Sequence, residues 1–299
     1  MKITKKHITI LALGGALLMP MACKKSFLKQ TNKFASSEEA TFQKSGDVVA
    51  LVNSIYDSFQ NADLLKKSIW YYANFQTHDF YNYGADIVWN NYTINSDFAA
   101  LYVFWSNAYF GIVRANSALS IIAKSKDKGV VTPELADRLT GEAYFLRGLY
   151  YYYLGGTFGG VPLELSALPG NGLTPRSTQD EVFKQVVADM KMAEQLLQSK
   201  TTLPASELGR ATKGAAYAYE GSAQMWLKNY TAALAAFNNS ELTNNYHLMP
   251  NFVDVHEFDH QNNDESLFEI QFAVQGSQSW DGGWQNGGEV AWIDDFSWP

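Results

Sequence analysis

The sequence GEAYFLRGLYYYYLGGTFGGVPL, residues 141–163, is the stretch around which the rest of this chain is organised. Residues 133–154 predict a helix, because apolar and aromatic side chains recur at three- and four-residue steps. The recurring residues are Ala143, Leu146, Tyr150, Tyr153 and Leu154. Thr132 is placed to cap this helix. We expect the glycine pair at 155–156 to end it, and the chain to leave through an extended Val-Pro-Leu segment.

Three further stretches have apolar residues at helical spacing. Residues 48–59 and 98–122 each predict a helix, and Asp47 is placed to cap the first of them. Residues 178–197 open with the pattern Thr-x-x-Glu, which is a capping box, and continue with an apolar stripe. These patterns predict a chain that is built mainly of helices.

Residues 211–242 predict two short helices that are broken at Lys228. Gly221, Ala233 and Phe237 match the small, small and aromatic positions of a tetratricopeptide unit. Small residues at such positions let two helices approach closely. The match covers one repeat, and no strict period of about 34 residues is visible elsewhere in the sequence.

The spacing changes near the end of the sequence. Apolar and polar residues alternate over 268–274, which predicts a short strand. Residues 276–299 are rich in glycine and tryptophan and have no regular period. We therefore expect an irregular loop after the strand.

The sequence 141–163 resembles the GEARFLRAxYYFxLxxxYGxVPL signature of SusD-like (RagB/SusD) nutrient-binding lipoproteins of Bacteroidetes. Four other segments resemble that family in the same order, and together they extend over nearly all of the chain: 51–59, 104–119, 176–197 and 209–237. The resemblance implies a mainly α fold, in which tetratricopeptide-like helical hairpins form a scaffold with long irregular loops and a few short strands. It also implies that residues 47–299 are the N-terminal helical domain of the family and that the C-terminal part is missing.

The first 22 residues have the pattern of a signal peptide. Three lysines precede an apolar run, and Ala22 is the small residue before a cleavage site. Cys23 follows at once and is the only cysteine of the chain, so we expect it to be a lipidation site. Residues 23–46 would then be a lipid-anchored tether. The alternative for residues 1–22 is a buried N-terminal helix.

Composition limits the class of partner. A hydrophobic content of 46% with 18% charged residues is typical of a globular protein. Removing residues 1–22 takes three of the 23 basic residues and none of the 30 acidic ones, so the mature chain has 20 basic residues and a net charge of −10. An acidic chain of this kind has no basic surplus for phosphates, which argues against a nucleic-acid partner.

Two aromatic stretches without helical spacing, 70–92 and 279–298, are the candidate ligand-binding segments. Flat rings beside amides and carboxylates suit a sugar, because a ring covers the C–H face while polar groups bind the hydroxyls. The candidate ligand-binding residues are Asp79, Tyr83, Trp89, Asn90, Trp280, Trp284 and Trp292. We expect the rings of Tyr83, Trp89, Trp280 and Trp284 to be exposed and those of Trp70, Tyr71 and Tyr72 to lie in the core. The alternative is that all these rings pack against the helices.

Residues 256–260 spell the zinc-peptidase pattern His-Glu-x-x-His. That chemistry needs His256, Glu257 and His260 on a helix, but Pro250 precedes them and the polar turn 261–264 follows. The adjacent pair Asp294-Asp295 gives little support to a glycosidase. No nucleophile elbow and no phosphate loop after a strand occur in the sequence. We therefore expect no catalytic residues, no metal and no cofactor.

The resemblance implies a function at the cell's outer membrane. It predicts a lipid-anchored, surface-exposed lipoprotein that binds a nutrient, such as a starch-like oligosaccharide or another glycan, and passes it to a SusC-like TonB-dependent transporter. Two alternatives stay open: a zinc-dependent peptidase that uses residues 256–260, and a tetratricopeptide-type scaffold that binds proteins.

Overall fold

The computed structural model describes residues 41–60, 64, 74–77, 80–81, 87–167, 173–255 and 257–271. From Phe42 onward these residues belong to one compact unit. The predicted signal peptide and the lipidation site Cys23 lie outside the described residues, as do Trp70, Tyr71 and Tyr72. None of the described helices is at once long enough and apolar enough to cross a membrane.

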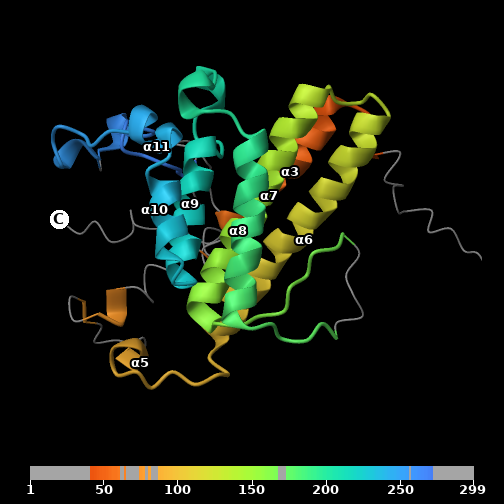
Figure 1. Cartoon of the computed structure of the whole chain (residues 1–299). Helices are drawn as coiled ribbons and strands as arrows, with labels where there is room; N and C mark the ends of the chain where they lie inside the picture. The colour runs from red at the N-terminus through yellow and green to blue at the C-terminus, as the bar shows by residue number, and fades with distance from the viewer. Residues whose placement is uncertain are drawn as a thin grey trace, which may run out of the picture. The chain divides into compact units, whose positions relative to one another are not determined.

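The described residues form helices that lie side by side (Figure 1). The α-helices are α3 (Ser45–Phe59), α5 (Ile87–Asn90), α6 (Ala99–Asp127), α7 (Pro133–Phe158), α8 (Gln179–Leu196), α9 (Lys213–Trp226), α10 (Tyr230–Phe237) and α11 (Ser240–Asn245). The short 3₁₀ helices are η3 (Lys200–Thr202), η4 (Ala205–Glu207), η5 (Val253–Val255) and η6 (Phe258–His260). From α6 to α10 each helix packs against the next, and α3 packs against both α6 and α7. The prediction of a mainly helical chain made of hairpins is confirmed.

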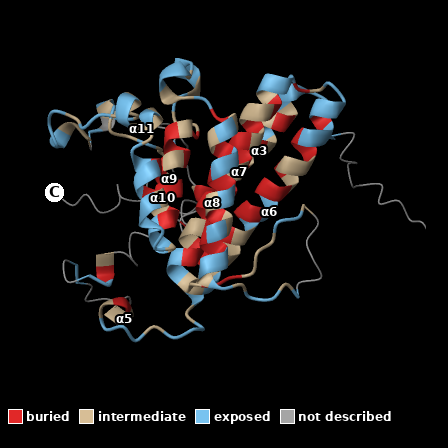
Figure 2. Cartoon of the chain, viewed as in Figure 1, coloured by how far each residue is buried: buried red, intermediate tan, exposed pale blue. Residues whose placement is uncertain are grey.

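α7 is the central helix of this row. It contacts α3, α6 and α8, and its buried residues therefore lie on several sides rather than on one stripe (Figure 2). Leu146, Tyr150 and Leu154 are fully buried, as their spacing predicts, and Tyr153 is half-buried. The Thr132 hydroxyl accepts a hydrogen bond from the Leu135 amide at 3.2 Å, which confirms the predicted N-cap.

The prediction that the glycine pair 155–156 ends this helix is wrong. α7 continues to Phe158, and Gly159 is its C-cap with φ 72°. Gly155 has a packing role instead: a Cβ atom there would lie 3.1 Å from Cγ1 of Val182 and 3.3 Å from the ring of Phe183. The missing side chain lets α8 lie close to α7.

Tyr150 joins α3, α6 and α7. Its ring stacks on the ring of Phe59 with centroids 3.8 Å apart and an interplanar angle of 7°. Its hydroxyl donates to the carbonyl of Ile55 at 2.8 Å. A Cβ atom on Gly111 of α6 would come within 2.1 Å of the Tyr150 ring, so only glycine fits opposite that ring.

A buried polar network joins α6, α7 and α8. Arg147 on α7 makes two hydrogen bonds to the carboxylate of Asp189 on α8, at 2.9 and 2.6 Å. It makes a third, at 2.8 Å, to the side-chain oxygen of Asn116 on α6. Gln185 donates to Asp189 at 2.9 Å. The network satisfies the charge of two buried side chains, as buried charges require.

The tyrosines of the central region hold the segment that leaves α7. Tyr109 on α6 donates its hydroxyl hydrogen bond to the carbonyl of Pro162 at 2.6 Å. The Tyr151 hydroxyl donates to the carbonyl of Glu164 at 2.9 Å and accepts from its amide at 2.7 Å. Pro162 and Arg176 form an isolated antiparallel bridge. The exit segment is thereby fixed along α6 and α7.

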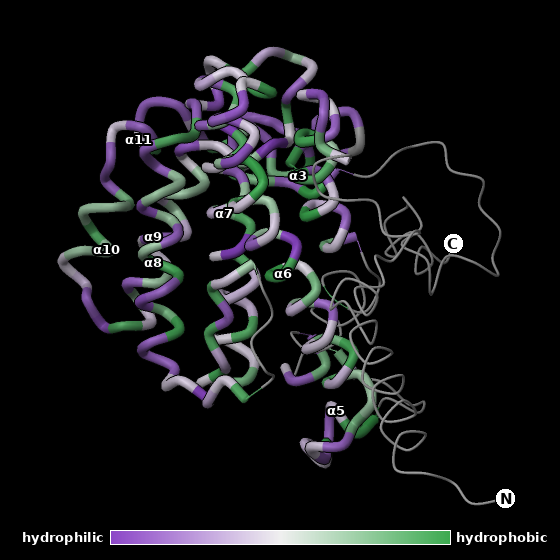
Figure 3. The backbone as a smooth tube through the Cα atoms, turned by 90° about the vertical axis from the view of Figure 1, so that its right-hand side faces the viewer, coloured by the Kyte–Doolittle hydropathy of each residue, from purple (hydrophilic) through white to green (hydrophobic). Residues whose placement is uncertain are grey.

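The α9–α10 hairpin has the geometry expected of a tetratricopeptide-type pair. The chain turns at Lys228, which has φ 59°, and α10 packs against α9. A Cβ atom on Gly221 would come within 2.5 Å of the Phe237 ring, and Ala233 is buried. α10 is hydrophobic along most of its length (Figure 3), and Leu234 on its outer side is 62% exposed.

Two local predictions are corrected. Asp47 is not the N-cap of the first helix: α3 begins at Ser45, and Asp47 in its first turn accepts from the amides of Lys44 and Gln43, at 2.9 and 3.1 Å. The predicted strand over 268–274 is absent from the part that the structure describes, 268–271, because no neighbouring strand pairs with it there. Phe268 and Ile270 instead pack against the helical core. Residues 272–274 lie outside the described range.

Candidate functional site

Two of the predicted ligand-binding residues, Trp89 and Asn90, are described, and both lie on α5. The expectation that Trp89 is exposed is wrong, because only 3% of its surface is accessible. Its indole packs edge-on against Phe98, with ring centroids 5.4 Å apart and an interplanar angle of 89°. The remaining predicted residues lie outside the described residues: Asp79, Tyr83, Trp280, Trp284 and Trp292.

Asn90 holds its own loop together. Its amide nitrogen donates to the carbonyls of Phe75 and Phe80, at 2.9 and 2.7 Å. Both amide hydrogens are thus directed at the backbone of residues that come earlier in the same loop. Phe75 is buried, so the described part of this loop has an apolar interior of its own.

Three aromatic rings of this segment are exposed to solvent. Phe80 is 44% exposed, Tyr81 56% and Tyr92 65%. Tyr92 has φ 54°, and its hydroxyl donates to the carbonyl of Gln76. Sequence reasoning found this aromatic stretch but not which of its described rings are exposed, since Gly, Asn and Asp neighbours do not distinguish an exposed ring from a buried one such as Trp89.

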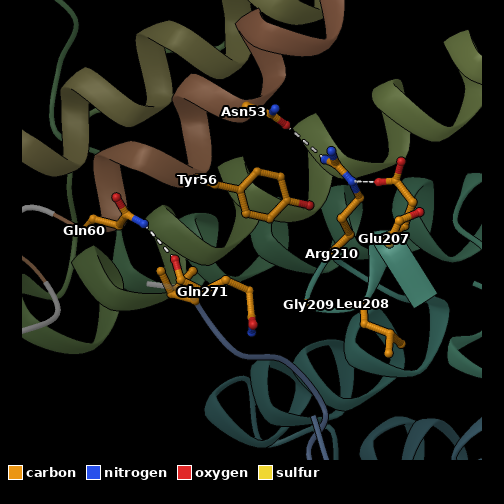
Figure 4. A pocket seen from close by; sticks show the side chains of 10 residues that line it. Asn53, Tyr56, Gln60, Glu207, Leu208, Gly209, Arg210 and Gln271 are labelled. Carbon is orange, nitrogen blue, oxygen red and sulfur yellow. Dashed lines mark hydrogen bonds and ion pairs between the residues drawn. The ribbon is translucent and has the colours of Figure 1, made fainter. Parts of the chain in front are cut away.

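A pocket of about 200 Å³ lies between α3, the segment around η4 and the end of the described chain (Figure 4). α3 contributes Asn53 and Tyr56, and its C-cap residue Gln60 lies on the same face because the three are three and four residues apart. The other lining residues are Ser206, Glu207, Leu208, Gly209, Arg210, Ile270 and Gln271. The amide of Gln60 donates to the carbonyl of Gln271 at 2.7 Å and so closes one side of the pocket.

The charged groups at the pocket are paired with one another. Arg210 donates to Asn53 and to Glu142, both at 3.0 Å, and its Nε donates to Glu207. Arg138 makes a further ion pair with Glu207 at 3.0 Å. Two arginines and two glutamates therefore lie at the pocket wall, and their charges cancel.

The hydroxyl of Tyr56, a residue that lines the pocket, lies on the side of Arg210 (Figure 4). It donates to Glu142 at 3.0 Å and accepts from the amide of Ala211 at 3.0 Å. Burial, and next the negative charge of Glu142, raise the pKa of Tyr56 well above its usual range. Burial also raises the pKa of the Glu142 carboxyl, against the opposite effect of Arg210 and Arg138. Tyr56 thus stays neutral and acts as a fixed part of the wall.

Sequence reasoning did not find this pocket. Its residues come from three segments, 53–60, 206–210 and 270–271, that are far apart in the sequence, and they are brought together by the packing of α3 against the helix row. The amides of Asn53 and Gln60 look like ordinary surface positions of an amphipathic helix. No local signal in the sequence marks them.

The zinc-peptidase pattern at 256–260 does not form an α-helix in the described residues. Glu257 is the N-cap of η6, a three-residue 3₁₀ helix that ends at His260, and His256 lies outside the described residues. Ligand-type atoms of Asp254, Glu257 and His260 lie within 4.8 Å of one another. Exposed acidic groups commonly gather without a metal, and we assign none here.

Comparison with known families decides the identity of this fold. The model of a SusD-like family, described as starch-binding and associating with the outer membrane, matches residues 21–222, which is more than half of the chain. The chain belongs to the SusD-like family. A SusD-like protein of Formosa agariphila is 24% identical over 267 residues, which cover 83% of this chain and 48% of that protein. The chain spans about half the length of the curated relatives it matches.

Solved structures of SusD-like proteins have the same fold. A laminarin-binding SusD-like protein superposes with a TM-score of 0.72 at 21% identity, over 82% of this chain and 55% of that one. Surface glycan-binding protein A from Bacteroides fluxus gives a TM-score of 0.69 at 21% identity, over 82% and 54% of the two chains. The helical scaffold expected from the sequence is therefore the scaffold of the SusD-like family.

Proposed function

We propose that this protein binds a glycan nutrient at the outer membrane and does not turn it over. The observation that carries the proposal is the group of exposed rings at Phe80, Tyr81 and Tyr92, which lies in the aromatic segment predicted to hold a sugar. Exposed rings of this kind offer flat apolar surfaces to the C–H faces of sugar units. The family description and the laminarin-binding relative support a carbohydrate as the ligand class.

The sequence candidates complete this proposed binding surface. Rings of Tyr83, Trp280, Trp284 and Trp292 would add stacking positions, and Asp79 would bind hydroxyls. Trp89 and Asn90 would position the loop without touching the ligand, because Trp89 is buried and Asn90 holds the loop backbone. This division separates residues that touch the ligand from residues that position the loop.

The proposal includes an anchor and a partner. Lipidation at Cys23 would hold the protein on the membrane surface, and a SusC-like TonB-dependent transporter would take up the glycan. Release to a transporter requires modest affinity, since a tightly held ligand would leave too slowly. The family's association with the outer membrane supports this arrangement.

A glycan array with the full chain tests the proposal. Saturable binding to one glycan class is expected, and the double variant Tyr81→Ala/Tyr92→Ala should weaken it about tenfold or more, as loss of two aromatic contacts predicts. Tyr230→Ala is the matched control, because Tyr230 is 61% exposed and lies on α10, far from this loop in the sequence. Equal affinity of the double variant and the control would overturn the assignment of the surface.

The peptidase alternative has a separate test. Incubation with Zn²⁺ and a peptide library should give no cleavage that depends on Glu257, because that residue lies at the start of a 3₁₀ turn rather than on an α-helix. If the protein cleaves a peptide and the variant Glu257→Gln does not, the function is catalysis rather than binding.

A further inference from the structure

We infer that the pocket beside α3 is a second ligand site, which accepts one neutral, hydroxyl-rich ring such as a single sugar unit. The site is distinct from the aromatic segment, because none of the residues described within 74–92 lines it. The choice of sugar rests on the proposed function. The choice of a neutral ring with several hydrogen-bonding groups rests on the pocket itself.

The first argument is charge. Arg210 already donates to Asn53, Glu142 and Glu207, and Glu207 is shared with Arg138. An anionic ligand would have to compete with two carboxylates for Arg210, and a cationic ligand would compete with two guanidinium groups for Glu207. Breaking a charge pair at a partly buried site is costly, so the pocket favours an uncharged molecule.

The second argument is the set of polar groups that remain. Within the described part of the chain, the amide NH₂ of Asn53, the amide oxygen of Gln60 and the hydroxyl of Ser206 make no hydrogen bond. They offer a donor, an acceptor and a group that can do both. Hydroxyl groups are both donors and acceptors, so a ring that carries several of them can satisfy all three positions.

The third argument is the apolar surface and the size. The half-buried ring of Tyr56 lies between Gln60 and Arg210 (Figure 4), and Leu208 and Ile270 add aliphatic surface. Sites for small molecules combine apolar lining with a few aimed polar groups in this way. A volume of about 200 Å³ suits a single sugar ring and is below the range of about 300–1,000 Å³ that is typical for larger ligands.

Titration of the full chain with methyl glucoside, methyl galactoside and methyl mannoside, followed by saturation-transfer NMR, tests the inference. We expect millimolar binding of at least one glycoside, as a ligand of this size in a half-open pocket implies. Asn53→Asp should weaken it about fivefold, because the variant keeps the oxygen that accepts from Arg210 but loses the free NH₂. Ser206→Ala should weaken it by a similar factor, and Leu208→Trp should abolish it by filling the space.

Ser120→Ala on α6 is the matched control, since it removes a hydroxyl that does not line the pocket. Ser206 is exposed and makes no hydrogen bond in the described structure, so Ser206→Ala is expected to fold normally, and circular dichroism checks this. Absence of glycoside binding by the folded protein overturns the inference. So does binding that Asn53→Asp, Ser206→Ala and Leu208→Trp leave unchanged.

The same titration in Tyr81→Ala/Tyr92→Ala separates this inference from the proposed function. Glycoside binding that depends on Ser206 and survives the double variant supports the pocket, even if no oligosaccharide binds to the exposed rings. Oligosaccharide binding that depends on Tyr81 and Tyr92, without any glycoside binding at the pocket, supports the proposed function and overturns the pocket.

Discussion

The guanidinium of Arg147 binds the carboxylate of Asp189 through two parallel hydrogen bonds of 2.9 and 2.6 Å, and both side chains are buried. Paired geometry of this kind is specific to arginine, because its planar fork matches a carboxylate. The pair joins the central helix α7 to α8, and Asn116 extends it to α6. Its arginine lies within the stretch 141–163 that carries the family signature.

Replacing Asp189 by alanine should destabilise the protein by about 3–5 kcal/mol, because the change leaves Arg147 buried without its counter-ion. Equilibrium unfolding in urea measures this difference. Asp180→Ala is the control, since Asp180 is an exposed acidic residue in the first turn of the same helix. A loss below about 1 kcal/mol for Asp189→Ala would show that the pair does not stabilise the helix row.

Gly221→Ala should destabilise the α9–α10 hairpin by about 1–3 kcal/mol, since overpacking of a close contact has that typical cost. The new Cβ atom would lie 2.5 Å from the Phe237 ring, and the ring would have to move. Thermal unfolding gives the difference. Gly46→Ala in the first turn of α3 is the matched control because nothing lies within 4 Å of its Cβ position, and it should leave stability unchanged or raise it slightly.

The stability of the protein should depend on pH through the titration of Glu194 on α8. Burial first, and then the negative charge of Glu220 on α9, raise the pKa of the Glu194 carboxyl to about 8. A group whose pKa is raised on folding stabilises the protein fully below its unfolded pKa of about 4.3, and that contribution disappears as the pH rises through about 8. The melting temperature should therefore fall between about pH 5 and pH 8.

Glu194→Gln should flatten this dependence, because an amide keeps the neutral form at every pH. Gln195→Ala, at an exposed position next to Glu194 on α8, is the control and should leave the slope unchanged because neither side chain titrates. Melting curves of both variants across the same pH series provide the comparison. If the melting temperature of Glu194→Gln still falls with pH as in the unmodified protein, another group is responsible for the titration.

Trp89→Ala should loosen the loop that carries the exposed rings, because a buried tryptophan contributes about 3–5 kcal/mol to the structure around it. Limited proteolysis should cut within residues 74–92 faster in this variant. Tyr230→Ala is the control, since Tyr230 is 61% exposed and lies on α10, outside this loop. Equal rates of cleavage would mean that Trp89 does not hold this loop.

The helices could be predicted because their signals are local. The Thr178 hydroxyl accepts from the amide of Glu181 at 3.2 Å, and the Glu181 carboxylate accepts from the amide of Thr178 at 2.7 Å, as the Thr-x-x-Glu pattern implies. The helix end predicted at the glycine pair 155–156 was wrong because glycine can either turn the chain or let another helix pack closely. At Gly155 it lets Val182 of α8 pack closely, and that contact depends on tertiary packing that the local sequence does not show.

The candidate site was less predictable for the same reason. Trp89 and Tyr92 are three residues apart in one aromatic stretch, yet one is buried and the other exposed. Which ring turns inward depends on Phe98 and on the hydrogen bonds of Asn90 to carbonyls 15 and 10 residues earlier in the chain. The pocket beside α3 depends on contacts between segments far apart in the chain, which no sequence period records.

The hydrogen bond from Tyr150 to Ile55 spans 95 residues, whereas α6 to α10 each contact the next helix along the chain. Contacts between sequence neighbours form quickly, and contacts across a long separation must first close a large loop. We therefore expect the row α6–α10 to assemble first and α3 to dock last. Amide hydrogens of α3 should then exchange with solvent through a separate, smaller opening, which would also release one wall of the pocket.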